Sequence, residues 1–432
     1  MHPCCNKINL GLCCINSTLN NQKPPITTNR SAKRKFSVTL AQDLAKLNVA
    51  DLKTLIHWNY THNIKCFRIS CDIFPRFTDL VADTRYNNPV SKKVKIDVLV
   101  EHKTDTIGKK IKTDDSFKIM LDELTTSRNT MDNMEPNYKI DFMQDELKQA
   151  GQLAMQYQQR IVMHSDPSSV VGTLNEGSFI KTCRNLHHYA QILDFMGIPT
   201  VSQLVCKGVA PEQIGAGVII THGGGLYIVE SNFKKPTKPT GKNATPDNMA
   251  MYRRKLTDIR LAVKILIKRR WIENFHRLPD IVRGRLVIEN DEDDFNITDC
   301  LEIAEACHIP MVLDFFHQQC FQERHYFQEL DPEMTTSDKI LNPEFVALFH
   351  RVIATWKNTR PLFHISERIP GISSTDKLAC KHSDYITKIP EPILELFKLC
   401  PTGVDLEVEA KAKELAIFHL WKTQPELYSY IE

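Results

Sequence analysis

Short apolar runs without a helical period recur along the chain, and most of them end in a histidine or a carboxylate. Runs of this length and composition are typical of strands that are buried on both faces, as in a parallel sheet. We predict eight strands from them: Ile8–Cys14, Lys65–Ser70, Arg160–His164, Gly217–His222, Arg285–Asn290, Met311–Phe315, Pro361–Ser366 and Val404–Glu409.

Between these runs, apolar residues recur at three- and four-residue spacing, which predicts amphipathic helices. We expect them at Leu47–Tyr60, Phe142–Gln158, Phe179–Phe195, Asp247–Phe275, Ile297–Ala306, Pro343–Trp356, Pro392–Leu399 and Ala412–Trp421. Eight strands that alternate with helices predict an α/β fold, a (β/α)8 TIM barrel. A length of 432 residues suffices for one large barrel or for two ordinary domains, and the alternation favours a single catalytic domain over residues 1–432.

Two stretches interrupt the alternation. Residues 77–137 form a polar, Lys- and Asp-rich segment after the second strand, and residues 232–248 form a Pro/Lys/Thr-rich loop after the fourth. Loops that follow barrel strands lie on the face where the strands end, so both are expected as insertions on that face. For the first, a disordered surface segment is an open alternative.

Because all strands of a parallel barrel end on one face, the polar residues at their ends should converge there. One histidine at a strand end is more often an ordinary polar residue than a ligand, but five histidines and three carboxylates in series predict a metal cluster. The predicted ligands are His164, His222, Glu289, Asp314, His317, His364, His382 and Glu409. Glu289, Asp314 and Glu409 are also the predicted catalytic residues, and the two oxygens of Glu289 suit a bridge between two ions.

Divalent ions on carboxylates and imidazoles activate water and neutralise an anionic transition state, which suits phosphodiester hydrolysis. A basic loop after the first strand supplies the residue types that contact phosphates. The predicted DNA contacts are Asn16, Asn29, Arg30, Lys33 and Arg34. The basic helix around Arg253–Arg254 and Lys268–Arg270 is expected on the outer wall with a structural role.

Composition narrows the classes further. A net charge of +3 does not by itself indicate a nucleic-acid binder. The 13 cysteines form no CxxC pairs, so neither a zinc ribbon nor a disulfide framework is indicated. No signal sequence and no membrane span are expected, which predicts a soluble intracellular protein, a monomer, whose compartment stays open.

Several motifs, in this order along the chain, resemble those of the UV damage endonucleases, which are relatives of endonuclease IV. They include Thr28-Asn-Arg30, Met163-His164, Ile288-Glu289-Asn290-Asp291, Asp314-x-x-His317 and Val408-Glu409-Ala-Lys411. The resemblance implies a TIM barrel with two or three divalent ions, Mn²⁺ in the first place and Zn²⁺ or Mg²⁺ as alternatives. It also implies incision of double-stranded DNA 5′ to ultraviolet photoproducts, which initiates excision repair.

The resemblance further implies which residues share an ion. His164 and His222 would hold one metal, with Glu289 bridging to a second. Asp314, His364 and Glu409 would complete the second site, and His317 and His382 would belong to a third.

The chain departs from the family pattern at two places. Leu362 stands where the family has a lysine near the third metal, and Ser165-Asp166-Pro167-Ser168 replaces the segment with an aromatic wedge. These departures leave open a lesion-binding protein with weakened catalysis. A sugar isomerase or epimerase, which uses the same barrel and metal-binding carboxylates, is a second alternative, although the histidine-rich rim and the basic loop argue against it.

Overall fold

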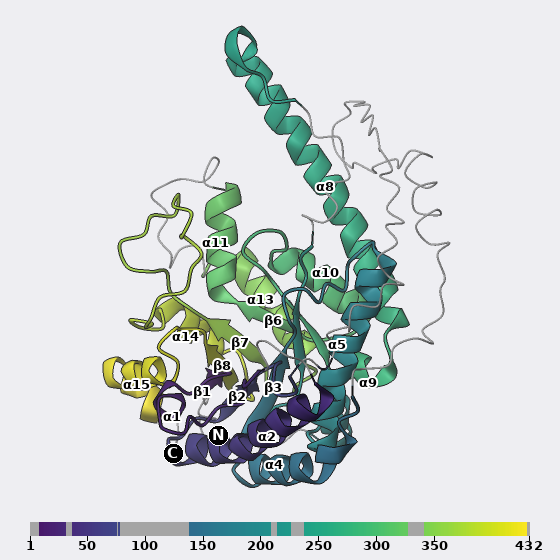
Figure 1. Cartoon of the computed structure of the whole chain (residues 1–432). Helices are drawn as coiled ribbons and strands as arrows, with labels where there is room; N and C mark the ends of the chain where they lie inside the picture. Colours follow the sequence, from purple (N-terminus) through teal and green to yellow (C-terminus); the bar gives the residue numbers. More distant parts are fainter. Residues whose placement is uncertain are drawn as a thin grey trace.

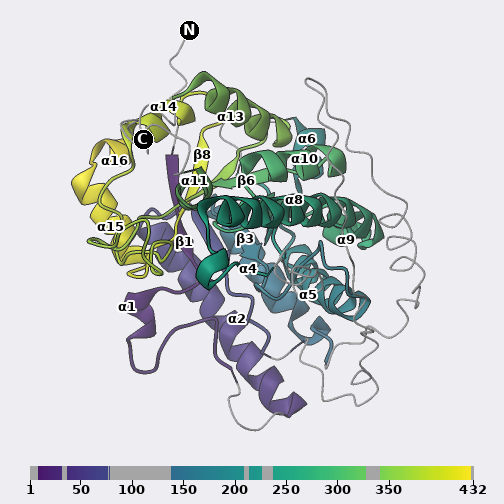
Figure 2. The same ribbon diagram turned by 90° about the horizontal axis from the view of Figure 1, so that it is seen from above.

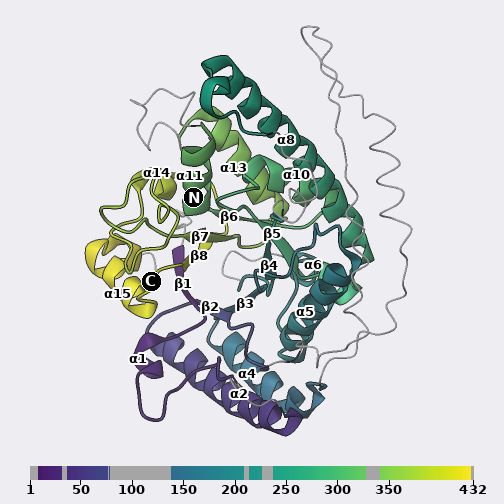
Figure 3. The same ribbon diagram turned by 45° about the horizontal axis from the view of Figure 1, so that its top comes forward.

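Eight parallel strands close into a barrel in the computed structural model, which describes residues 8–31, 37–75, 77, 138–208, 214–225, 237–326 and 341–429 (Figure 1). Each strand pairs with its neighbours in sequence, and β8 closes the ring on β1. The strands are β1 Ile8–Cys13, β2 Cys66–Ile69, β3 Arg160–His164, β4 Ile219–His222, β5 Leu286–Glu289, β6 Met311–Asp314, β7 Leu362–Ile365 and β8 Val404–Val408. Figure 3 shows the ring obliquely from one end.

Helices surround the barrel (Figure 3). The longer ones are α2 Val38–Thr61, α4 Gln144–Gln156, α5 Glu176–Phe195, α8 Pro246–Arg277, α10 Ile297–Cys307, α11 Phe315–Tyr326, α13 Pro343–Thr355 and α15 Glu414–Thr423. The shorter ones are α1 Ser17–Asn20, α6 Val201–Lys207, α9 Asp280–Arg283, α14 Glu391–Phe397 and α16 Glu426–Ser429, with 3-10 turns at Asp141–Met143 and Gly241–Asn243. Side-chain caps start several of them; Thr245, for example, accepts from the backbone N–H of Asn248 ahead of α8.

The period of two along the strands divides the barrel interior into layers. Asn9, Arg160, Arg360 and Asp405 form a polar layer at the end where the strands begin. Above it lies a small apolar cluster that includes Val162, Val287, Val312 and Leu362. The third layer, at the strands' carboxyl ends, carries the histidines and carboxylates described below. Apolar side chains of the opposite strand faces pack against the helices.

The predicted fold class is confirmed, and every predicted strand overlaps an observed one with ends that differ by two residues or fewer. The helix α11 was not predicted, because its sequence FFHQQCFQERHY lacks a clear apolar stripe.

The predicted loop 232–248 ends earlier than expected, since Pro246 already belongs to α8. Of the segment 77–137 only Phe77 is among the described residues, so its role as an insertion stays a prediction. Among the helices described, none is both long and apolar enough to cross a bilayer.

Candidate metal centre

The ends of β3 to β7 each place a polar side chain on the barrel axis. The Nε2 atom of His164 lies 3.0 Å from Oε2 of Glu289, and Nδ1 of His364 lies 2.8 Å from Oε1 of the same carboxylate. His222 approaches Glu289 to 3.7 Å and His317 to 3.6 Å. Glu289 is fully buried, so four imidazoles from separate elements face one carboxylate at the centre of the rim.

Asp314 is fixed beside this centre by the backbone. Asn290 donates to the carbonyl of Asp314 and accepts from its N–H, both at 2.9 Å, which joins the ends of β5 and β6. The Oδ1 atom of Asp314 accepts from the N–H of His317 at 2.8 Å. The helix α11 begins directly after β6, so the Asp-x-x-His spacing corresponds to its first turn. This turn brings Nδ1 of His317 to 3.6 Å from Oδ2 of Asp314.

The far side of the rim comes from β2 and β8. Glu407 and Glu409 face inward two residues apart, and Arg68 reaches both, with Nη1 2.5 Å from Glu409 and 3.3 Å from Glu407. His364 Nε2 lies 2.9 Å from Glu407, and His364 Nδ1 lies 3.6 Å from Glu409. His382, in the segment between β7 and α14, comes within 3.8 Å of Glu409.

Burial and charge act against each other in this cluster. Burial alone would raise the pKa of Glu289, but the facing imidazoles of His364 and His222 hold it well below its usual range. Burial also opposes the protonated form of His364, yet Glu289 and Glu409 raise its pKa well above the ordinary value. For Asp314, burial is the stronger effect and raises the pKa. Four carboxylates thus lie close together with one arginine.

The donor set fits divalent cations. Several buried ligand-type atoms have no aligned hydrogen-bond partner among the described residues: Asp314 Oδ2, both oxygens of Glu407, Nε2 of His364 and Nδ1 of His222. Buried polar atoms of this kind require a partner, and imidazole nitrogens with carboxylate oxygens suit Zn²⁺ or Mn²⁺.

Ligand atoms within 4.8 Å of one another define overlapping groups of three. The groups are His164–His222–Glu289, Glu289–Asp314–His317, Asp314–His364–Glu409, His317–His382–Glu409 and Cys13–Glu407–Glu409. All eight predicted ligands are therefore close enough together for two or three ions, and the metal-binding role of each stays a prediction.

Sequence reasoning missed part of the rim. Glu407, Arg68 and Cys13 were not among the predicted site residues. The period of two from Glu409 points to Glu407, because alternate residues of a strand share a face. Arg68 carries no such signal from its own neighbourhood, since its role depends on the closure of β1, β2 and β8 into a ring.

The predicted DNA contacts stay predictions. Asn16 is buried and caps α1 by accepting from the N–H of Leu19. Asn29 accepts from the hydroxyl of Thr27, and Arg30 pairs with Asp51 at 2.6 Å. Lys33 and Arg34 lie outside the described residues.

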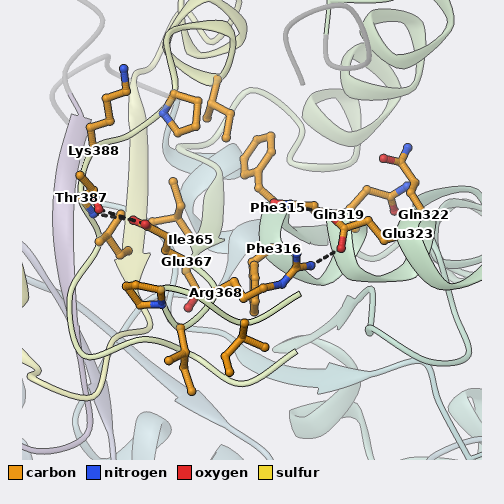
Figure 4. Close-up of a pocket in the computed structure, with 18 of the residues that line it drawn as sticks. Phe315, Phe316, Gln319, Gln322, Glu323, Ile365, Glu367, Arg368, Thr387 and Lys388 are labelled. Carbon is orange, nitrogen blue, oxygen red and sulfur yellow. Dashed lines mark hydrogen bonds and ion pairs between the residues drawn. The ribbon is translucent and has the colours of Figure 1, made fainter. Parts of the chain in front are cut away.

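A separate cavity of about 590 Å³ lies between α11 and the segment that follows β7 (Figure 4). Phe315, Phe316, Ile365 and Gln319 line it, and an ion pair between Arg368 and Glu323 crosses one side. None of the eight predicted ligands lines it, although Phe316 and Ile365 are their direct neighbours in sequence. The cavity is therefore separate from the candidate metal centre.

The fold and the rim together define a (β/α)8-barrel protein with a candidate multi-ion centre at the carboxyl end of its strands. The sequence model of the UV-endonuclease UvdE family matches residues 8–97 and 265–432, more than half of the chain. The chain belongs to this family of UV-damage endonucleases.

Individual relatives agree. A protein of Acanthamoeba polyphaga mimivirus, which is provisionally named a UV-damage endonuclease, is 24% identical to this chain. The match covers 96% of this chain and 91% of the viral protein. The UV-damage endonuclease of Schizosaccharomyces pombe is 22% identical over 95% of this chain, which spans only 50% of the yeast protein. The crystal structure of SacUVDE superposes with a TM-score of 0.58 at 21% identity and covers 98% of this chain and 99% of that one, which supports the barrel fold.

Proposed function

We propose that this chain is a metal-dependent endonuclease that incises double-stranded DNA on the 5′ side of ultraviolet photoproducts and so initiates excision repair. One observation carries the proposal. Five strand or helix ends bring His164, His222, His317 and His364 around Glu289 at 2.8 to 3.7 Å, inside a chain of the UV-endonuclease family.

The residues of the rim have distinct tasks in this proposal. His164 and His222 would hold one ion with Glu289, Asp314 and His364 would hold a second with Glu409, and His317 with His382 would belong to a third. Divalent ions bound there, Mn²⁺ being the expected one, would lower the pKa of a water molecule and neutralise charge on the scissile phosphate. Arg68 orients Glu409 by direct contact, and Asn290 fixes the position of Asp314.

The third ion should be held more weakly than the other two. Leu362 is fully buried in the apolar layer two residues before His364, so β7 offers no further ligand to His317 and His382. We expect a calorimetric titration with Mn²⁺ to resolve a class of weaker sites. Three ions of equal affinity would show that another group compensates for the leucine.

The test of the function is incision of a duplex that carries one defined photoproduct, with Mn²⁺ and with EDTA. We expect a single nick immediately 5′ to the lesion with Mn²⁺, and none with EDTA or in an undamaged duplex. Tight binding of the damaged duplex without a nick would instead favour the lesion-binding alternative, which Leu362 and the exposed Pro167 and Ser168 in place of an aromatic wedge motivate.

A further inference from the structure

The two halves of α8 have different surroundings. From Val263 onward the helix packs into the core, and Val263, Ile267 and Trp271 are fully buried. The cations of this half have counter-charges: Lys264 lies 2.7 Å and Lys268 3.2 Å from Asp299. This half is part of the outer wall of the barrel, as the sequence analysis expected for the whole helix.

The preceding half, residues 246–262, is different, and we call it the projecting half. None of its described side chains is buried, and Arg253, Arg254 and Lys255 are exposed. In the part of the chain that the structure describes, these three side chains have no ion-pair partner. Residues 237–262 contain six Lys and Arg against two Asp, a net charge of +4 by sequence, compared with +3 for the entire chain.

The position of this charge relates it to the rim. The chain leaves the carboxyl end of β4 before α8 and returns from α8 towards the start of β5, so the helix begins on the ligand-bearing side. Figure 1 shows its first half rising well beyond the barrel. Seen from above in Figure 2, that half crosses over the ring rather than pointing away from it. At 1.5 Å per residue, the 17 residues from 246 to 262 extend for about 25 Å.

We propose that the projecting half of α8 binds the phosphate backbone of a DNA duplex that lies on the rim, opposite the candidate metal centre. This inference rests on the proposed function and deepens it, because it assigns a second DNA contact on a separate element. Arg253, Arg254 and Lys255 neutralise phosphates without reading bases, so they strengthen binding to damaged and undamaged duplex alike. Among the described residues this half of the helix packs on no core, and a polar helix of this kind is otherwise difficult to explain.

The test compares two variants with an equal change of charge. The first carries Arg253→Gln, Arg254→Gln and Lys255→Gln; glutamine is a good helix former, so the helix should persist. The control carries Lys148→Gln, Lys181→Gln and Lys207→Gln, which are exposed positions on α4, α5 and α6. Affinity for an undamaged duplex is measured in EDTA at several salt concentrations, so the readout does not require incision.

We expect the first variant to lose up to about 2.7 units from the slope of log K against log salt, which corresponds to three phosphate contacts. On a duplex that carries one photoproduct, its hydroxyl-radical footprint without Mn²⁺ should lose protection within about seven base pairs of the lesion, the span of 25 Å on a duplex. The control should match the wild type. Equal slopes for all three proteins, or equal losses in both variants, would overturn the proposal.

Two measurements separate the possible failures. Circular dichroism checks that the first variant keeps its helix content, and Arg253→Lys with Arg254→Lys should retain the wild-type slope because charge rather than shape is required. If the wild type fails to incise irradiated DNA but the salt slopes behave as expected, the proposed function fails and the DNA contact stands. If incision occurs and the slopes do not change, only the contact fails.

Discussion

The barrel encloses two buried polar clusters that are built in opposite ways. At the end where the strands begin, Asp405 accepts from Arg160 at 2.9 Å, from Arg360 at 2.8 Å and from Asn9 at 2.8 Å. Two guanidinium groups thus balance one carboxylate with well-formed hydrogen bonds. The rim at the other end holds four carboxylates and one arginine, and several of its polar atoms have no aligned partner among the described residues.

The difference indicates what each cluster is for. In the folded protein, a buried carboxylate with fixed counter-charges stabilises the arrangement of its neighbours. Removing one partner leaves the remaining buried charges uncompensated. A buried cluster with excess negative charge and orphaned ligand atoms is costly by itself and is suited to receive cations. Only a few residues separate the two along each strand, with Val162, Val287 and Leu362 in the apolar layer between them.

The largest effect should come from the centre of the rim. Glu289→Gln keeps the volume of the side chain but removes the charge that four histidines surround. We expect incision to fall about a thousandfold or more, which corresponds to several kcal/mol of lost transition-state stabilisation. The thermal unfolding midpoint without metal should not fall. Glu292→Gln, at the edge of the rim 3.8 Å from His317, is the control and should cost much less activity.

A purified Glu289→Gln protein that retains near-wild-type incision would contradict the role of Glu289 as a shared ligand. If the variant loses incision only because it unfolds, Glu289 contributes to stability as Asp405 does. The contrast between the rim and the Asp405 cluster would then disappear.

The complementary substitution is in the cluster around Asp405, at the end of the barrel where the strands begin. Asp405→Ala leaves Arg160 and Arg360 buried without their carboxylate, so we expect a loss of about 3–5 kcal/mol in the free energy of unfolding. Urea denaturation measures it, and Asp384→Ala at an exposed position should stay within about 0.5 kcal/mol of the wild type. A loss below about 1 kcal/mol would show that this cluster contributes little to stability.

The sequence could predict the rim better than it could predict what surrounds it. His164, His222, Glu289 and Asp314 end strands, and the rule that parallel strands end on one face is enough to bring them together. His317 was predicted as a ligand although its helix was not, because the Asp-x-x-His spacing is visible without the secondary structure. The exact partners of each group depend on ring closure and register, which no local pattern contains.

Other parts required three-dimensional information. Arg68 contacts Glu407 and Glu409 across more than 330 residues of sequence, a pairing that exists only once β1 lies between β2 and β8. The amphipathic pattern of α8 predicted a helix, but not that its first half would extend beyond the wall. The difference between a packed and a projecting helix is decided by neighbours such as Asp299, not by the helix's own sequence.

Cations should distinguish the clusters directly. Because an ion that binds only the native state stabilises it, Mn²⁺ at 100 times its dissociation constant should add about 2.7 kcal/mol to the free energy of unfolding. The Asp405→Ala protein should keep this increment, whereas Glu289→Gln should lose most of it. The measurement is thermal unfolding across a Mn²⁺ titration. Equal increments in all three proteins would place the stabilising ion away from the rim.

The smallest effect concerns a buried polar group that belongs to neither cluster. His188, on α5, stacks on Phe77 with ring centroids 3.6 Å apart, and neither ring nitrogen has a hydrogen-bond partner among the described residues. Burial, with a smaller contribution from His187, lowers its pKa from 6.5 to about 3. This side chain therefore remains neutral in the native state, in contrast to the ionised clusters.

A histidine pKa that is lower in the native than in the unfolded protein makes the native state less stable as the pH falls. Between about pH 6.5 and pH 3 the unfolded chain binds a proton at His188 that the native state does not bind, so protonation favours unfolding as the pH falls. The contribution approaches about 1.4 kcal/mol per pH unit in that window and vanishes above it. We expect His188→Leu to remove this contribution, so the stability difference between variant and wild type should be constant above pH 7 and grow in favour of the variant towards pH 4. Urea denaturation at a series of pH values measures it; a difference that does not change with pH would show that the pKa of His188 is the same in the native and the unfolded protein.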